Sequence, residues 1–252
     1  MIRILACLLL SVLSNGLTAQ SRPADSSVLL PGTGKFSFLG FGDYAFKIHG
    51  DSSRRSTTNY YGQQNNYSVF DIRRIYLGYD HVFDKKFSAE FLLSHEGNLD
   101  ASDNRTFFIK LANVKWKNIF KNSDLVMGDM ATPTFAGMER LWGYRSIEKT
   151  ITDMRAIGIS NDVGIALKGR FDSAGRSGYM LMAGNGRGQK PENNLFKKIY
   201  ANWYTKLFNQ RFIIDVNMDF ERLQQQTGRS LSKATYKLGL AYQQPTYPVG
   251  FE

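Results

Sequence analysis

The sequence predicts an all-β protein, a transmembrane antiparallel β-barrel, and three observations support this prediction. A secretory signal begins the chain, short segments alternate apolar with polar side chains, and the connections between those segments alternate between long and short. Lipid admits only helices or closed barrels, because every backbone polar group needs an internal partner. Barrel strands are about 10 residues of alternating pattern. The three observations together predict strands that cross a membrane.

The first twenty residues, MIRILACLLLSVLSNGLTAQ, have the pattern of a secretory signal peptide. Arg3 precedes an apolar run, which gives way to small and polar residues. The run is too short to cross the hydrocarbon layer as a helix, which takes about 20 residues. We therefore expect cleavage near Ala19 or Gln20, with residues 21–35 as a linker and the barrel over residues 36–252.

Cys7, the only cysteine, lies inside this signal. The mature chain would then have no disulfide and no cysteine-held metal, so its stability has to come from other interactions. The glycines of AGNGRGQ, Gly184, Gly186 and Gly188, resemble a phosphate cradle. They lie outside any βαβ unit, so they predict a loop. No metal-ligand spacing occurs, and we expect no metal and no cofactor.

The segment RFIIDVNMDFE shows the alternation most clearly. Its apolar side chains fall on one face and its charged or amide side chains on the other, with Ile213 as the exception. The segments KATYKLGLAYQ, FSFLGFGDYAFKI and NDVGIALKGRF alternate in the same way. A soluble sandwich strand can alternate too. Aromatic residues at the rims of an apolar face are typical of membrane barrels.

Ten strands are predicted when weaker segments are included, and the connections after the odd-numbered strands are longer than those after the even-numbered ones. This is the rule of outer-membrane barrels, whose periplasmic turns are tight and whose outer loops are long. The longest connection, after the fifth strand, contains MERLWGYRSIEKT, which fits neither a strand nor a clean helix. The predicted strands cover residues 36–48, 69–80, 86–95, 105–117, 124–131, 158–171, 177–185, 195–206, 211–221 and 233–243.

Two stretches resemble a known family. VFDIRRIYLGYDHVFDKKFSAEF is similar to a strand pair of the phosphate-selective porin O and P family, and VMGDMATPTFAGMERLWGYRSIEK with SNDVGIALKGRF is similar to its constriction loop and next strand, especially in Bacteroidetes-type porins. The resemblance implies a sixteen-stranded homotrimeric porin of the bacterial outer membrane, whose third outer loop narrows a cationic lumen. Ten strands and a final Glu252 then suggest an amino-terminal fragment, and a complete ten-stranded barrel is the alternative.

The charge fits such a pore. Lysine and arginine exceed aspartate and glutamate by ten, or by nine without Arg3. Behind a signal peptide we expect this excess to favour small anionic solutes such as phosphate rather than nucleic acid, because rings of Arg and Lys select anions in pores. The alternative is that these cations bind anionic headgroups of the outer-membrane lipid. The predicted function is a passive diffusion channel and not an enzyme.

Candidate site residues fall into two groups. We expect the constriction to contain Arg140, Tyr144, Arg145, Lys149 and Arg155, and the lumen wall to contain Arg73, Lys110, Asp162, Lys168 and Arg170. The alternative for the constriction cations is an internal ion-pair net with Glu139, Glu148 and Asp153. Neighbouring Arg73 and Arg74 should point to opposite faces unless a bulge intervenes.

An alternative function is an outer-membrane hydrolase. His49 and His95 lie at the predicted outer ends of two strands, near Glu96, Asp100 and Asp103. A histidine paired with a carboxylate can activate water. No nucleophile motif accompanies these residues, so the channel is the preferred prediction.

Overall fold

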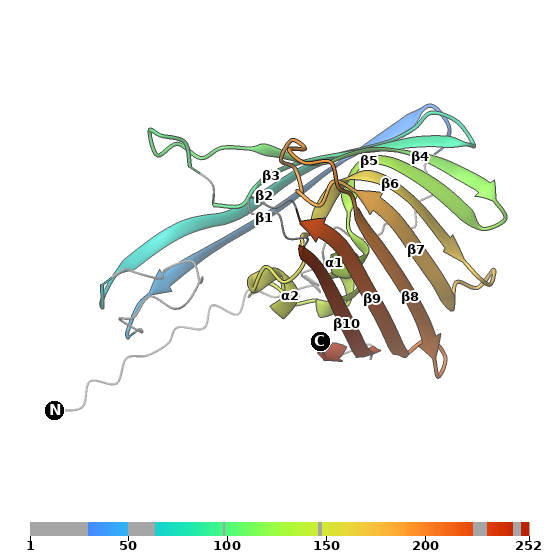
Figure 1. The fold of residues 1–252 in the computed structure, drawn as a ribbon. Coiled ribbons are helices and arrows are strands. Elements are labelled where there is room, and N and C mark those ends of the chain that lie inside the picture. The colour runs from blue at the N-terminus through green and yellow to red at the C-terminus, as the bar shows by residue number, and fades with distance from the viewer. Residues whose placement is uncertain are drawn as a thin grey trace.

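The structure, a computed structural model, describes residues 30–49, 64–97, 99–145, 148–223, 231–243 and 248–251. The predicted signal peptide and most of the predicted linker lie outside the described residues. Eleven strands form one antiparallel sheet in which each strand pairs with its neighbour in the sequence (Figure 1). The strands are β1 (Thr33–Phe46), β2 (Ser68–Val82), β3 (Phe87–His95), β4 (Phe108–Phe120), β5 (Ser123–Ala131), β6 (Asn161–Arg170), β7 (Ser177–Gly184), β8 (Lys198–Leu207), β9 (Phe212–Leu223), β10 (Leu231–Gln243) and β11 (Pro248–Phe251).

The all-β prediction is confirmed, and each of the ten predicted segments forms a strand. The short strand β11 was not predicted. The connections after β1, β3, β5 and β7 are longer than those after β2, β4, β6 and β8, as expected. Over the described residues β1 and β11 end the strand order without pairing to each other, so the sheet is open. Closure into a barrel therefore remains a prediction.

Two helices occupy the long connection between β5 and β6: α1 (Pro133–Trp142) and α2 (Ile151–Met154). Neither helix was predicted from the sequence, although α1 has clear boundaries. Pro133 occupies its first turn, where a missing N–H costs nothing, and Gly143 ends it in the left-handed conformation at φ 68°. Within the described ranges, no helix is long and apolar enough to span a membrane.

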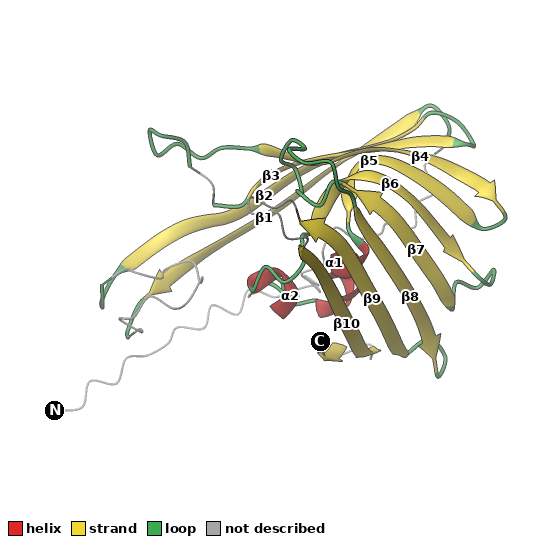
Figure 2. Cartoon of the chain, viewed as in Figure 1, coloured by secondary structure: helices red, strands yellow, loops and turns green. Residues whose placement is uncertain are grey.

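The sheet curves around α1, which lies on its concave side and contacts β7 to β11 (Figures 1 and 2). We call the face of the sheet toward α1 the inner face and the opposite one the outer face. Val126, Met130, Ala166 and Met182 form, with Met180 and Tyr200, a small buried apolar cluster. A second cluster joins Met138 of α1 to Ile213 and Ala241. These clusters are small for a chain of 252 residues.

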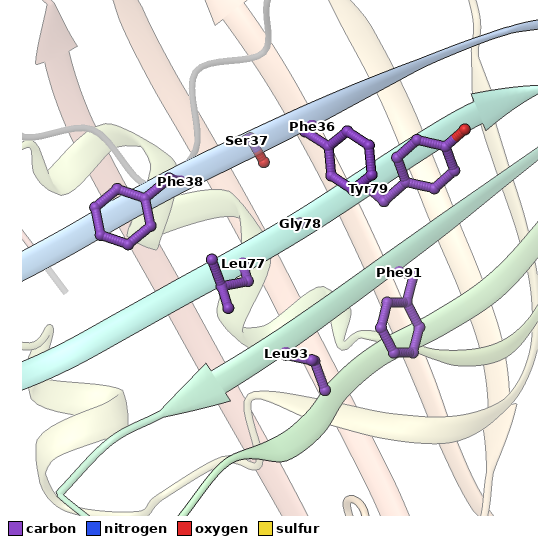
Figure 3. A pocket seen from close by; sticks show the side chains of 8 residues that line it. All are labelled: Phe36, Ser37, Phe38, Leu77, Gly78, Tyr79, Phe91 and Leu93. Atoms are coloured by element: carbon purple, nitrogen blue, oxygen red, sulfur yellow. The ribbon is translucent and has the colours of Figure 1, made fainter.

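The outer face is apolar and exposed. Phe36, Phe70 and Tyr236 have 82%, 84% and 80% of their surface exposed. On β1 to β3, outward aromatic and leucine side chains flank Gly78 and line a shallow pocket (Figure 3). Every strand from β1 to β10 contributes at least one exposed large apolar side chain, namely Phe36, Phe70, Phe91, Ile109, Met127, Ile165, Leu181, Ile199, Val216 and Tyr236.

The inner face is largely buried and carries charged and amide side chains beside the apolar residues of the two clusters. Its side chains include Arg74, Ser94, Lys110, Asn113, Asp162, Lys198, Asp215, Asn217 and Asp219, each buried. On β9 the alternation matches the predicted pattern residue for residue, with Val216, Met218 and Phe220 outward and Asp215 inward. A soluble domain buries its apolar face and exposes its polar face, and this sheet does the reverse.

Candidate pore-lining site

Arg145 ties the long connection to itself and to the sheet. Its guanidinium forms ion pairs with Glu139 of α1 and, at 3.4 Å, with Asp153 of α2, and it donates a hydrogen bond of 3.2 Å to the Tyr76 hydroxyl of β2. Burial alone would lower the pKa of Arg145, but Tyr76, Glu139 and Asp153 raise it above its ordinary value, so the side chain stays charged. These contacts match the internal ion-pair net that the sequence left as an alternative.

The side chain of Glu139 is buried beside this arginine. Its Oε2 has no hydrogen-bond partner among the described residues, while Oε1 accepts from Arg145. A buried carboxylate without a partner cation is costly, because the charged form loses its solvation. Glu139 therefore depends on Arg145 to remain ionised in this position.

A β-bulge brings two arginines of β2 to the same face. Phe41 of β1 pairs with Arg74 and the next residue pairs with Ile72, so Arg73 is the extra residue of the bulge. Both arginines then reach Glu148 of the long connection, at 3.8 Å for Arg73 and 3.9 Å for Arg74. The bulge is therefore the reason that these neighbouring arginines do not point to opposite faces.

Lys110, predicted to line the lumen, lies on the inner face and is buried. Its ammonium pairs with Glu96, which also accepts hydrogen bonds from Tyr76 at 3.0 Å and Ser94 at 3.1 Å. Burial raises the pKa of Glu96, but the charge and hydrogen bond of Lys110 outweigh it and lower that pKa to about 2. Tyr76 thus links this pair to Arg145, and the four side chains form one continuous network.

Of the remaining constriction candidates, Arg140, Tyr144 and Arg155 lie apart from this network, and Lys149 borders it through Asp153. Arg140 is exposed on α1, and Arg155 is exposed directly after α2. Tyr144 is exposed and packs edge-on against Trp142, with ring centroids 5.7 Å apart. Lys149 is partly exposed, with its ammonium 4.0 Å from an Asp153 oxygen. Of the five predicted constriction side chains, Arg145 alone is buried.

A group of cations lies on the inner face near the short turns. Lys168 of β6 is within electrostatic range of Arg140 and Lys115, which repel its charge, and of Glu90 and Asp124, which attract it. Arg170 and Arg140 are both within electrostatic range of the Tyr204 hydroxyl of β8. Within the described residues none of these four cations forms an ion pair within 4 Å. We call Lys115, Arg140, Lys168 and Arg170 the open cation group.

Asp162 lies on the inner face, as predicted for a lumen residue, but its side chain is fully buried. Its carboxylate accepts hydrogen bonds from the backbone N–H groups of Gly186 at 2.7 Å, Arg187 at 3.3 Å and Gly188 at 3.2 Å, and from the Tyr200 hydroxyl at 2.9 Å. Gly186 and Gly188 have positive φ, which turns successive N–H groups toward one anion. Gly186 and Gly188 lie in a loop, as predicted, and this loop cradles the internal carboxylate, whereas Gly184 is the last residue of β7.

For the hydrolase alternative, the His95 ring contacts a backbone carbonyl and an arginine among the described residues. This side chain is buried, with Nδ1 3.0 Å from the Thr106 carbonyl and Nε2 3.2 Å from Arg105. The neighbouring Glu96 is occupied by Lys110. Across the described ranges, no group of three or more His, Cys, Asp or Glu side chains could hold a metal ion.

No protein-family model matches the chain, and no curated protein matches it significantly.

Proposed function

We propose that the chain forms an outer-membrane porin, a passive diffusion channel that prefers small anions such as phosphate. The observation that carries this proposal is the inverted sheet, in which large apolar side chains are exposed along β1 to β10 while charged and amide side chains are buried on the inner face. Contiguous exposed apolar surface of this extent marks contact with lipid or with another protein. A membrane strand has this pattern, with apolar residues outward and polar residues inward.

The long connection supports a channel rather than a filled barrel. It places α1 and α2 on the concave side of the sheet, and ion pairs of Arg145 and Glu148 hold it to β2 and to itself. Irregular backbone at membrane depth is tolerated where it is buried in protein or lines water. A loop fixed in this way would narrow a lumen.

The charge distribution supports a preference for anions. The carboxylates of Glu139, Asp153, Glu96 and Asp219 have cation partners. The open cation group has no ion-pair partner within 4 Å among the described residues, so its field reaches the solvent beside α1. Cations in a narrow passage with low-dielectric walls raise the local concentration of anions. The sequence resemblance adds phosphate as the candidate solute and a homotrimer as the candidate assembly.

Planar-bilayer recording of the full-length protein tests the proposal. In a salt gradient the unaltered protein should give a reversal potential on the anion-selective side, and a Lys168→Gln, Arg140→Gln double variant should move it toward cation selectivity. The shift should shrink as ionic strength rises, because salt screens the field. Arg176→Gln, in an exposed turn where Arg176 pairs with Asp172, is the matched control and should leave the potential unchanged. Absence of channels, or a soluble product, would contradict the proposal.

A further inference from the structure

The inner face of β9 carries a row of acidic and amide side chains. Their negative charge conflicts with the proposed preference for anions. Asp215, Asn217 and Asp219 lie on this face with 2%, 1% and 3% of their surface exposed, and Glu221 continues the row. An exposed row of carboxylates on a pore wall would attract cations and repel anions. The question is what removes these charges from the solvent.

α1 lies directly over this row. Thr134 donates a hydrogen bond of 3.5 Å to the Asp219 carboxylate, and Lys237 of β10 donates one of 2.5 Å to the Thr134 carbonyl. One turn later, Gly137 faces Asp215. A Cβ placed on Gly137 would lie 2.7 Å from Oδ2 of Asp215 and 2.9 Å from Oδ1. The backbone of α1 therefore rests on the carboxylate, and this approach requires a residue without a side chain.

The Asp215 carboxylate cannot easily move aside for a larger residue. Its Oδ1 accepts a hydrogen bond of 2.7 Å from the side-chain amide of Asn202, and its Oδ2 accepts one of 2.7 Å from the side-chain amide of Asn217. Glycine is a poor helix former, so Gly137 in the middle of α1 is unfavourable for the helix itself. Close contact with β9 gives the glycine a reason to be there.

Met138, the next residue of α1, fixes the helix in this position. Its side chain is buried against Ile213 of β9 and Ala241 of β10. It also lies over Gly239, where an added Cβ would meet its sulfur at 2.5 Å. The helix is thus held by an apolar contact on one side of the acidic row and by polar contacts along it.

The row is only partly neutralised by cations. Lys198 pairs with Asp219 at 2.9 Å and approaches Glu221 at 3.9 Å. Asp215 receives its hydrogen bonds from neutral amides. Its charge is therefore kept from the solvent chiefly by the helix that covers it.

We propose that α1 is a cover for the acidic row of β9, so that a permeating solute meets the open cation group and not the carboxylates. Gly137 is the positioning residue that allows the cover to close. This inference rests on the proposed function and deepens it, because it assigns the anion preference to concealed carboxylates as well as to exposed cations. It makes α1 an electrostatic element of the pore wall rather than an obstruction alone.

The test combines two substitutions in the full-length protein. Gly137→Leu lifts α1 from β9 and should reduce the anion-to-cation permeability ratio by about four- to sixteenfold. One unit charge ~10 Å from an ion, at an effective dielectric of ~40–80, changes the local population of that ion by about two- to fourfold, and it does so in opposite directions for anions and cations. Asp215→Asn alone should leave the ratio unchanged because that charge is covered. The double variant should recover the unaltered ratio, and Gly137→Ala should give a smaller change than Gly137→Leu.

Thiol labelling measures the cover without relying on currents. The only native cysteine lies in the predicted signal peptide, so Ala241→Cys, at a buried position of β10 that packs against Met138 of α1, introduces a single reporter into the mature chain. A methanethiosulfonate reagent should leave this cysteine unmodified while Gly137 is present and should modify it when Gly137→Leu is added. Lys168→Cys, at an exposed position of the same face, is the labelling control and should react in both backgrounds.

The outcomes separate this inference from the proposed function. Absence of current from the unaltered protein contradicts the proposed function. If channels are present but Asp215→Asn alone shifts the permeability ratio, the acid is already exposed and the cover is refuted. The cover is also refuted if Gly137→Leu leaves both the labelling and the ratio unchanged, or increases labelling without changing the ratio.

Discussion

Arg145 offers the sharpest test of how the long connection is held. Replacing it with methionine keeps much of the side-chain volume but removes ion pairs with Glu139 and Asp153 and the hydrogen bond to Tyr76. Removing one partner of a buried ion pair costs about 3–5 kcal/mol, because the other charge is left buried without compensation. Glu139 is that remaining charge, since one of its oxygens already lacks a partner among the described residues.

The expected result is local opening of α1. A loss of ~3 kcal/mol multiplies the open population by about 150, at about 1.4 kcal/mol per factor of ten. Amide hydrogen exchange of residues 133–142, measured by mass spectrometry on the full chain in lipid, should accelerate by about that factor, while exchange of β9 stays slow. Adding Glu139→Leu should recover much of the protection, because removing both charges leaves none uncompensated.

Arg140→Met is the matched control, because this arginine is exposed on the same helix and has no ion pair among the described residues. Its exchange should stay within about twofold of the unaltered protein, since surface charges contribute ~0–1 kcal/mol. Equal exchange in Arg145→Met and the unaltered protein would refute the view that this arginine holds the connection. If hydrogen exchange accelerated equally in Arg145→Met and Arg140→Met, the effect would come from the loss of any positive charge on the connection and not from the contacts of Arg145.

Three further predictions follow from the same structure. Phe38→Lys, on the outer face, should reduce insertion into vesicles by up to ~2–4 kcal/mol near the midplane, whereas Ser37→Lys, one residue away on the inner face, should be tolerated; equal yields of folded protein would show the faces to be wrong. The ion pair between Glu96 and Lys110 should contribute up to ~3 kcal/mol to the free energy of unfolding above pH 4.5, because the pKa of Glu96 is lowered in the folded protein. This contribution should be lost as the pH falls toward 2, where Glu96 becomes protonated. The free energy of urea unfolding should therefore differ between Glu96→Gln and the unaltered protein at pH 7 but not near pH 2. Asp162→Ala should free the connection between β7 and β8, because each charge-assisted hydrogen bond that it loses contributes about 1.5–3 kcal/mol, and limited proteolysis between residues 185 and 197 should accelerate.

The strands could be predicted because their signal is local. A period of two over about ten residues requires no knowledge of partners, and on β9 it assigned Val216 and Asp215 to the correct faces. The alternation alone predicts that a new charge at Asn217 would be tolerated, because this residue points inward. In the structure Asn217 donates to Asp215, so an aspartate there would place two carboxylates together.

The site was harder to predict because its contacts join distant segments. The alternation of side chains along one strand indicates that Asp162 points inward. It cannot show that the loop from Asn185 to Gly188 folds over the Asp162 carboxylate. The helix α1 was missed because MERLWGYRSIEKT spans its end, so helical and irregular residues were taken together. Treating Pro133 and Gly143 as boundaries would have isolated the helix.

The bulge in β2 has a consequence for how this strand tolerates changes of length. In a strand with one face in lipid, losing a single residue normally turns every side chain beyond that point to the wrong side. Arg73 has no opposite residue on β1, so deleting it would leave Phe70 and Ile72 facing outward before the gap and Leu77 facing outward after it. β2 thus contains one position at which a codon can be lost without inverting the strand, and the loss would remove one arginine from the inner face.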